Sequence, residues 1–200
     1  MTDVPPTRSG LLELQEKREL AEKGHGLLEK KRDALIHKFF ELIDEYKEKK
    51  QSTYHDLKKA YGTLHKAQAV NGVDRVRSVG FSQEDALQIA LGTENLMGVT
   101  VPDYTVRIQS DDRNVSPMEP DQSLTKAAEQ FRIIAKQLVQ LSELENTIHK
   151  LSEAIQKTKR RVNSLEHVKI PEMEAVEKQI DQKLMEKERQ RFASLKQMKK

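Results

Sequence analysis

Residues 134–165 read IAKQLVQLSELENTIHKLSEAIQKTKRRVNSL, and apolar residues recur in this stretch every seven positions. A heptad repeat places its apolar rows on one face of a helix, where they pack against a second helix. The first row consists of Ile134, Leu141, Ile148, Ile155, Val162 and, further along, Val176. The second row consists of Leu144, Leu151, Thr158 and Leu165. The stretch therefore predicts one half of a coiled coil.

The N-terminal part of the chain carries a matching seam. Its first row consists of Leu14, Ala21, Leu28, Leu35 and Leu42, and a neighbouring row consists of Leu11, Phe39, Tyr46, Thr53, Ala60 and Ala67. No proline occurs between Pro6 and Pro102, and Thr7 offers a helix cap directly after Pro6. We therefore expect one long helix over residues 7–70, on the order of 90 Å at 1.5 Å per residue.

Residues 71–123 have a different composition, because they hold four of the eight glycines and three of the six prolines. Asn71-Gly72 is a turn signal, and helical periodicity stops there. Residues 99–101 and 104–108 alternate as strands do, which predicts a small β-hairpin or sheet. Residues 82–85, Ser-Gln-Glu-Asp, resemble a capping box that would begin a short helix through Leu91. The structure of residues 82–91 stays open between these alternatives.

Pro171 interrupts the C-terminal helix over residues 124–200. The alternatives are two separate helices or one kinked helix, and we favour a kink because Val176 keeps the phase of Val162 across the proline. Two long helices separated by about 50 residues can pair with each other, which brings both termini to one end. The predicted fold is mainly α: a long antiparallel two-helix coiled coil with a small central α/β-hairpin region.

The composition argues against a compact globular domain, since 36% of residues are hydrophobic, 34% are charged and 4% are aromatic. The net charge of +3 conceals an acidic, lysine-free segment over residues 71–123, where four arginines face nine acidic residues. Lysines alternate with glutamates on the helices, and few aromatics lie among them, so we expect no nucleic-acid partner. No apolar run reaches the roughly 20 residues needed to cross a bilayer, so we expect no direct membrane insertion. The absence of cysteine is compatible with the cytoplasmic location that we expect.

Motifs for catalysis and for cofactor or metal binding are missing. The chain has no cysteine and no Gly-x-x-x-x-Gly-Lys-Ser/Thr loop, and its six histidines lack metal-ligand spacing. We interpret Gly24-His25-Gly26 as a place of close helix approach, and Asp111-Asp112 as a solvated turn. The sequence therefore predicts no catalytic residue, no cofactor and no metal.

Three stretches of the sequence indicate a particular family of coiled-coil proteins. Residues 160–171, Arg-Arg-Val-Asn-Ser-Leu-Glu-His-Val-Lys-Ile-Pro, are similar to a signature near the end of the D subunit of archaeal and vacuolar-type rotary ATPases. Pro6-Thr7-Arg8 with residues 27–35 resembles the N-terminal signature of that family, and residues 97–102 resemble the turn and strand of its central hairpin. The matches fall in the family's order and span nearly the whole chain.

This resemblance implies a non-catalytic central-stalk rotor subunit, peripheral to the membrane through its complex. It implies a catalytic hexamer of A and B subunits around the paired termini, the F subunit alongside the coil, and a socket subunit of the membrane ring at the opposite end. Rotation would couple ATP synthesis or hydrolysis to proton or sodium transport. Carried over to this chain, the bearing end in the hexamer holds Arg8, Arg189, Arg191 and Lys196.

A prefoldin-like coiled-coil chaperone is the main alternative, because it also joins two paired helices through β-hairpins. Its working ends would expose apolar residues as an open grip. In this chain we expect the ends of the coiled coil to be charged instead. Phe192, Leu195 and Met198 are spaced three residues apart, which places them in a row along one face of a helix. A nucleic-acid-binding coiled coil is a third possibility, which rests only on the +8 charge of the helical segments.

Overall fold

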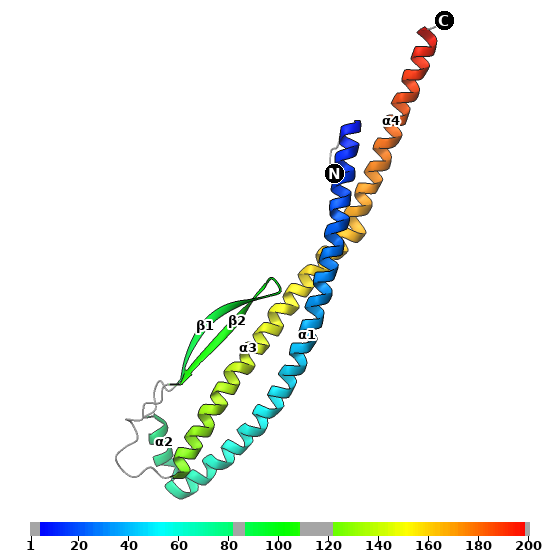
Figure 1. Ribbon diagram of the computed structural model, residues 1–200. Coiled ribbons are helices and arrows are strands. Elements are labelled where there is room, and N and C mark those ends of the chain that lie inside the picture. The colour runs from blue at the N-terminus through cyan, green and yellow to red at the C-terminus, as the bar shows by residue number, and fades with distance from the viewer. Residues whose placement is uncertain (1–4, 82–86, 109–121, 199–200) are drawn as a thin grey trace. The chain divides into compact units, whose positions relative to one another are not determined.

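The computed structural model describes residues 5–81, 87–108 and 122–198. In chain order the elements are α1 (Arg8–Asn71), α2 (Val73–Phe81), β1 (Leu87–Leu96), β2 (Val99–Ile108), α3 (Gln122–Ser164), the π-helical turn η1 (Leu165–Lys169) and α4 (Ile170–Met198) (Figure 1). Contacts divide the chain into unit 1, Met1–Ile36 with Ala154–Lys200, and unit 2, His37–Glu153. The predicted class, mainly α with two long antiparallel helices and a small central hairpin, is confirmed.

Helix α1 begins at the predicted cap. The Gly10 amide donates a hydrogen bond to Thr7 Oγ1 at 3.1 Å, and the Leu11 amide donates to the Thr7 carbonyl at 2.9 Å. The first bond satisfies one of the amide groups that the start of a helix leaves without an internal partner, and the second is the first backbone bond of the helix itself. Because Pro5 and Pro6 cannot continue the helix on the N-terminal side, the start of α1 is fixed at this point.

Unit 1 pairs the first half of α1 with η1 and α4 in an antiparallel sense. Gln15 Nε2 donates to Glu177 Oε1 at 2.8 Å, and further along α1 His25 Nε2 lies 3.6 Å from Glu166 Oε2. As the residue number rises along α1, the residue number of the contacting side chain on the other helix falls, so the two helices are antiparallel. The buried side chains of unit 1 are Leu14, Leu35, Thr158, Val162 and Ile180.

Unit 2 pairs the second half of α1 with the first part of α3 in the same sense. Gln137 Nε2 donates to Asp56 Oδ2 at 3.2 Å, and the rings of Tyr61 and Phe131 meet edge to face with centroids 5.6 Å apart. The buried side chains of unit 2 are Leu42, Thr53, Ala60, Ala67, Val101, Ala127, Ile134, Thr147 and Leu151. Small residues at Ala60, Ala67 and Ala127 make this end of the seam narrow.

Gly72 ends α1. Its φ of 80° is left-handed, and its amide donates to the Gln68 carbonyl at 2.9 Å, which is a glycine-capped helix end. Asn71 Nδ2 donates to Ser123 Oγ at 3.2 Å, so the end of α1 lies beside the start of α3. The expectation that helical periodicity stops at Asn71 is wrong for residues 73–81, which form the short helix α2. The apolar positions Val73 and Val76 and the first-turn Asp74 are helix signals that the turn at Asn71-Gly72 masked.

The central hairpin is larger than predicted. Strands β1 and β2 pair antiparallel over ten residues each, from Leu87 opposite Ile108 to Leu96 opposite Val99. Residues 99–101 and 104–108 are strand, as predicted, but they belong to one strand that continues through Pro102. The alternative of a short helix through Leu91 is wrong for residues 87–91, which begin β1, and residues 82–86 lie outside the described part.

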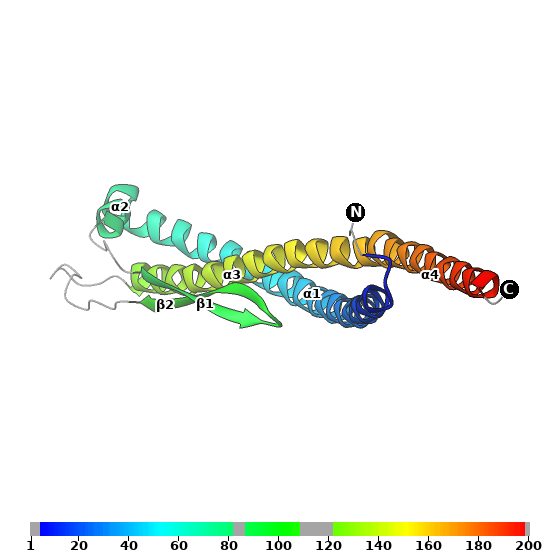
Figure 2. The same cartoon turned by 90° about the horizontal axis from the view of Figure 1, so that it is seen from above.

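The hairpin turn consists of Met97 and Gly98, whose φ angles are 55° and 81°. Two positive φ angles define the type I′ turn that suits the right-handed twist of paired strands. The Asn95 side chain supports the turn, because its Oδ1 accepts the Gly98 amide at 2.8 Å. In Figures 1 and 2 the hairpin runs alongside α3, where Asn146 Nδ2 donates to the Tyr104 hydroxyl at 3.1 Å.

The C-terminal helix passes through Pro171 by way of a π-turn. The Ile170 amide donates to the Leu165 carbonyl, five residues back instead of four. A proline in a helix has no amide to donate, and its ring crowds the carbonyl four residues earlier. The wider turn directly before Pro171 relieves this conflict, and α4 then continues to Met198.

Candidate functional site

The predicted seam residues lie along the paired faces of the helices. Six are buried: Leu14, Leu35, Leu42, Ile134, Leu151 and Val162. The others are half-buried: Ala21, Leu28, Leu141, Leu144, Ile148, Ile155, Leu165 and Val176. On α4 the buried contact is Ile180, which the heptad count did not select. Ile180 lies eighteen residues after Val162, and the π-turn and Pro171 lie between them, so the seven-residue count does not continue unchanged into α4.

Polar side chains bridge the two helices near the termini. Arg18 lies between two carboxylates of α4, with its Nε 3.3 Å from Glu177 Oε2 and its Nη1 3.5 Å from Glu174 Oε1. Arg8 forms an ion pair with Glu188, and Lys187 Nζ reaches the Pro6 carbonyl at 3.5 Å. These bridges fix the register of α1 against α4, although exposed ion pairs contribute little stability individually.

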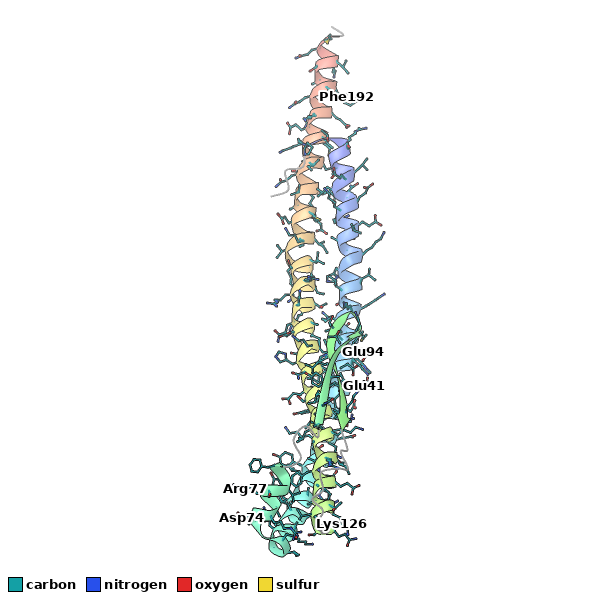
Figure 3. All side chains as sticks on the ribbon, turned by 90° about the vertical axis from the view of Figure 1, so that its left-hand side faces the viewer. Glu41, Asp74, Arg77, Glu94, Lys126 and Phe192 are labelled. Atoms are coloured by element: carbon teal, nitrogen blue, oxygen red, sulfur yellow. The ribbon has the colours of Figure 1, made fainter. Side chains whose placement is uncertain are left out.

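Helix α4 continues past the partner helix. Since α1 begins at Arg8, opposite Glu188, residues 189–198 have no described partner helix, and they extend for about 15 Å at 1.5 Å per residue. Every residue from Met185 to Met198 is exposed. Phe192, which is 73% exposed and labelled in Figure 3, shares this segment with Leu195 and Met198. We call residues 189–198 the free end of α4.

The predicted bearing cations lie at this end. Arg189, Arg191 and Lys196 are exposed on the free end and form no ion pair within residues 5–81, 87–108 and 122–198. Arg8 lies at the start of α1 and is paired with Glu188. The free end therefore combines cations with exposed apolar side chains, which is the mixture expected of a surface that contacts protein.

A second group of cations was not predicted as a site. Its members lie in unit 1 and are exposed, and none has an ion pair with a residue that the structure describes: Lys30, Lys31, Lys157, Lys159, Arg160 and Arg161. Residues 154–163 contain four cations and no acid, whereas elsewhere lysines alternate with glutamates. That local excess was the signal in the sequence. We call these six residues the basic collar.

Several charged side chains on the surface of α1 form ion pairs with neighbours on the same helix. Hydrogen bonds from Lys17, Lys23 and Lys38 lower the pKa values of Glu13, Glu19 and Glu41 respectively, and the charges of the same lysines add to the effect. Asp33, which accepts a hydrogen bond from Arg32, raises the pKa of that guanidinium. These are solvated helix faces, and their pKa shifts do not point to acid–base chemistry.

The glycine pair of α1 is not a point of close helix approach. A Cβ added at Gly24 or Gly26 would meet no atom within 4 Å, so that interpretation of the sequence is wrong. Asp111-Asp112 lies outside the described residues. Across the described ranges, no group of three or more His, Asp or Glu side chains could hold a metal ion. None of the helices in these ranges is long and apolar enough to span a membrane.

Comparison with known proteins gives consistent matches over the whole length. The family model of the ATP synthase D subunit matches residues 10–200. An A-type ATP synthase D subunit of Methanobrevibacter smithii is 41% identical over 96% of this chain and 85% of its own length. The corresponding subunits of Methanopyrus kandleri and Pyrococcus horikoshii are 38% and 36% identical, over 100% and 98% of this chain and 87% and 93% of their own lengths.

These matches confirm the resemblance inferred from residues 6–8, 27–35, 97–102 and 160–171. They also confirm that the chain is a subunit of a larger assembly rather than an enzyme in itself. With a family match over nearly all of its residues and relatives above 35% identity, the chain belongs to the family of ATP synthase D subunits.

Proposed function

We propose that the chain is the central-stalk rotor subunit of an A-type ATP synthase. In this role it couples ATP synthesis or hydrolysis in a hexamer of A and B subunits to rotation of a membrane ring that transports protons or sodium ions. Family membership supports the proposal, and so does the antiparallel helix pair with its free end of α4. The observation that carries the proposal is family membership over nearly the whole chain, and the exposed free end of α4 agrees with it.

The free end would sit in the hexamer as the bearing. Phe192, Leu195 and Met198 would contact apolar side chains of the surrounding subunits, and Arg8, Arg189, Arg191 and Lys196 would face their carboxylates. The same exposed apolar residues would also suit the substrate-binding end of a prefoldin-like chaperone. The free end alone therefore does not distinguish a rotor subunit from a chaperone. Family membership sets that alternative aside.

A rotor must favour one catalytic site over the other two at each angle. It can do so only if it makes different contacts with each site. A two-helix shaft has no three-fold symmetry, and the basic collar adds an uneven distribution of charge to its surface. As the rotor turns, each pair of A and B subunits would therefore contact a different combination of cations and apolar residues. This difference would make the three catalytic sites change conformation one after another.

Two further contacts complete the proposal. The F subunit would bind alongside the helix pair, and the socket subunit would receive the end that holds α2. Exposed apolar side chains there include Val70, Val73 and Phe81. A narrow two-helix seam buries little surface for its length, so these partners would also stabilise the shaft. The complex, not the chain itself, would bring the shaft to the membrane from the cytoplasmic side.

Reconstitution tests the proposal. The purified chain is mixed with the cognate hexamer of A and B subunits and with the F subunit, and the masses of the products are measured. A complex with one copy of the chain per hexamer is expected. Absence of any complex with cognate partners would overturn the rotor assignment.

A charge-reversal series tests the bearing end. The triple variant Arg189→Glu, Arg191→Glu, Lys196→Glu should weaken binding to the hexamer by about tenfold or more, because close charge pairs at interfaces contribute on this scale. The matched control reverses Lys58, Lys59 and Lys66, three exposed cations of α1 in unit 2, and should leave hexamer binding unchanged. Equal losses in both variants would remove the bearing assignment.

A further inference from the structure

The two-residue turn of the hairpin determines where the backbone groups of β1 point. Because Leu96 and Val99 flank the turn, they exchange hydrogen bonds, and so does every second pair beyond them, from Glu94 with Val101 to Gln88 with Arg107. The amides and carbonyls of the alternate residues therefore point away from β2. In β1 these outward residues are Leu87, Ile89, Leu91, Thr93 and Asn95.

The outward edge of β1 is not covered by any residue that the structure describes. All residues from Gln88 to Asn95 are exposed, and none of their backbone groups bonds to a described residue outside the hairpin. Ile89 and Leu91 lie on the same face of the strand, and Leu91 is 77% exposed. Both the backbone edge and an apolar stripe beside it are thus accessible to another chain.

The two edges of the hairpin differ in their protection. Pro102 of β2 stands opposite Thr93, at a position whose backbone points outward, so the edge of β2 lacks one donor. Asp103 and Arg107 add charges to β2, and its Val101 is buried while its Tyr104 bonds to Asn146 of α3. β1 contains no proline, lysine or arginine, and Glu94, near the hairpin tip in Figure 3, is its only charged residue. Proteins block strand edges with proline and charge where pairing must be avoided, and here only β2 is blocked.

A free strand edge specifies its occupant more closely than an apolar patch does. Among protein partners, only another extended backbone can form hydrogen bonds with all of these alternating amides and carbonyls together. A two-stranded sheet is also marginal alone, and a third strand makes it stable. We propose that the outer edge of β1 accepts an extended segment of another subunit of the complex as a third strand.

The chemistry of that segment follows from β1. Residues opposite Ile89 and Leu91 should be apolar, and the residue opposite Glu94 should be lysine or arginine, because cross-strand neighbours on one face interact directly. The inference rests on membership of the complex, so its occupant is another subunit. A second copy of this chain offers the same edge and is the competing outcome.

Amide hydrogen exchange of the intact chain tests the proposal. Exchange is measured for the chain alone, for its complex with the cognate hexamer and the F subunit, and for the whole synthase. The amides of Ile89, Leu91 and Thr93 should exchange at least about tenfold more slowly in one of these assemblies, while the outward amides of β2 at Tyr104 and Val106 stay unchanged. An assembled complex without this protection overturns the inference and leaves the rotor proposal intact. Failure to assemble overturns both. Protection that develops in the chain alone as its concentration rises identifies a second copy and also overturns the inference.

Paired proline variants separate strand addition from side-chain coverage. Thr93→Pro removes an outward donor from β1, and Thr100→Pro removes an outward donor from β2, and both residues are exposed. Thr93→Pro should abolish the protection and weaken assembly by about tenfold, a change in affinity that corresponds to the loss of one or two hydrogen bonds. Thr100→Pro should change neither the protection nor the affinity. If Thr93→Pro unfolds the hairpin, Leu91→Lys keeps the backbone and should produce the same loss by charging the edge. Equal behaviour of the β1 and β2 variants contradicts the proposal.

Discussion

His25 of α1 and Glu166 of η1 face each other, with Nε2 and Oε2 3.6 Å apart. The contact joins two stretches of helix that depart from favourable helix-forming sequence or geometry. His25 stands between two glycines, which are poor helix formers, and Glu166 lies in the π-turn before Pro171. Each helix of the pair therefore has an intrinsically weaker stretch at this contact.

Gly24→Ala and Gly26→Ala should each stabilise the chain by up to about 1 kcal/mol, because alanine is the better helix former and its Cβ has room at both positions. Thermal unfolding followed by circular dichroism measures the effect, and the double variant should show the sum. A lower melting temperature in either variant would mean that the helix needs glycine there for a reason other than space.

Leu35→Ala should destabilise the chain by about 2–5 kcal/mol, because Leu35 is 0% exposed and its truncation leaves a cavity in the seam. Leu27→Ala is the matched control on the same helix, since Leu27 is 69% exposed, and should change stability by less than about 0.5 kcal/mol. Urea unfolding of both variants gives the comparison. Similar midpoints for the two would contradict the assigned seam.

Gly72→Ala and Gly62→Ala should act in opposite directions. Gly72 has a φ of 80°, which costs an L-residue roughly 1–2 kcal/mol, so its substitution should destabilise the end of α1. Gly62 lies inside α1 with no atom within 4 Å of an added Cβ, so its substitution should stabilise the helix. Thermal melts that shift in the same direction would contradict the assigned helix end.

Acid should weaken α1 through its short-range ion pairs. Hydrogen bonds from Lys17 and Lys23 hold the pKa values of Glu13 and Glu19 below the ordinary value of 4.5. A lowered carboxyl pKa stabilises the helix above pH 4.5, and that contribution is lost as the pH falls through the lowered pKa. Circular dichroism between about pH 6 and pH 3 should therefore show a smaller loss of helix in the double variant Lys17→Met, Lys23→Met than in the parent. Identical acid titrations would show that the pairs contribute nothing measurable.

The helix pair could be predicted because burial along a helix follows the spacing of apolar side chains directly. Leu14, Leu35 and Val162 fall in heptad rows and are buried. Strand β1 could not be predicted in the same way, because its residues from Gln88 to Asn95 are exposed on both faces and their burial does not alternate. Its structure comes from the hydrogen bonds to β2, and the local signal at residues 82–85 pointed to a helix instead.

The candidate surfaces were less predictable than the fold. Lysine and glutamate on a helix look alike whether they face water or protein, so Arg160 and Arg161 were recognised as part of a signature and not as part of a charged collar. Ile180 was missed because the π-turn and Pro171 end the strict heptad count before α4. Only the pairing of α1 with α4 reveals that residues 189–198 extend past the partner helix.

Single-molecule rotation tests the rotor assignment most directly, and the absence of cysteine from the chain makes site-specific labelling simple. Asp74→Cys and Arg77→Cys place two reactive thiols on exposed positions of α2, both labelled in Figure 3. A bead is attached to these thiols in a complex of the chain with the F subunit and a surface-fixed hexamer, without the socket subunit. If the chain is the rotor, ATP should drive the bead in one direction through complete turns. A complex that hydrolyses ATP while the bead stays at a fixed angle would contradict the rotor assignment.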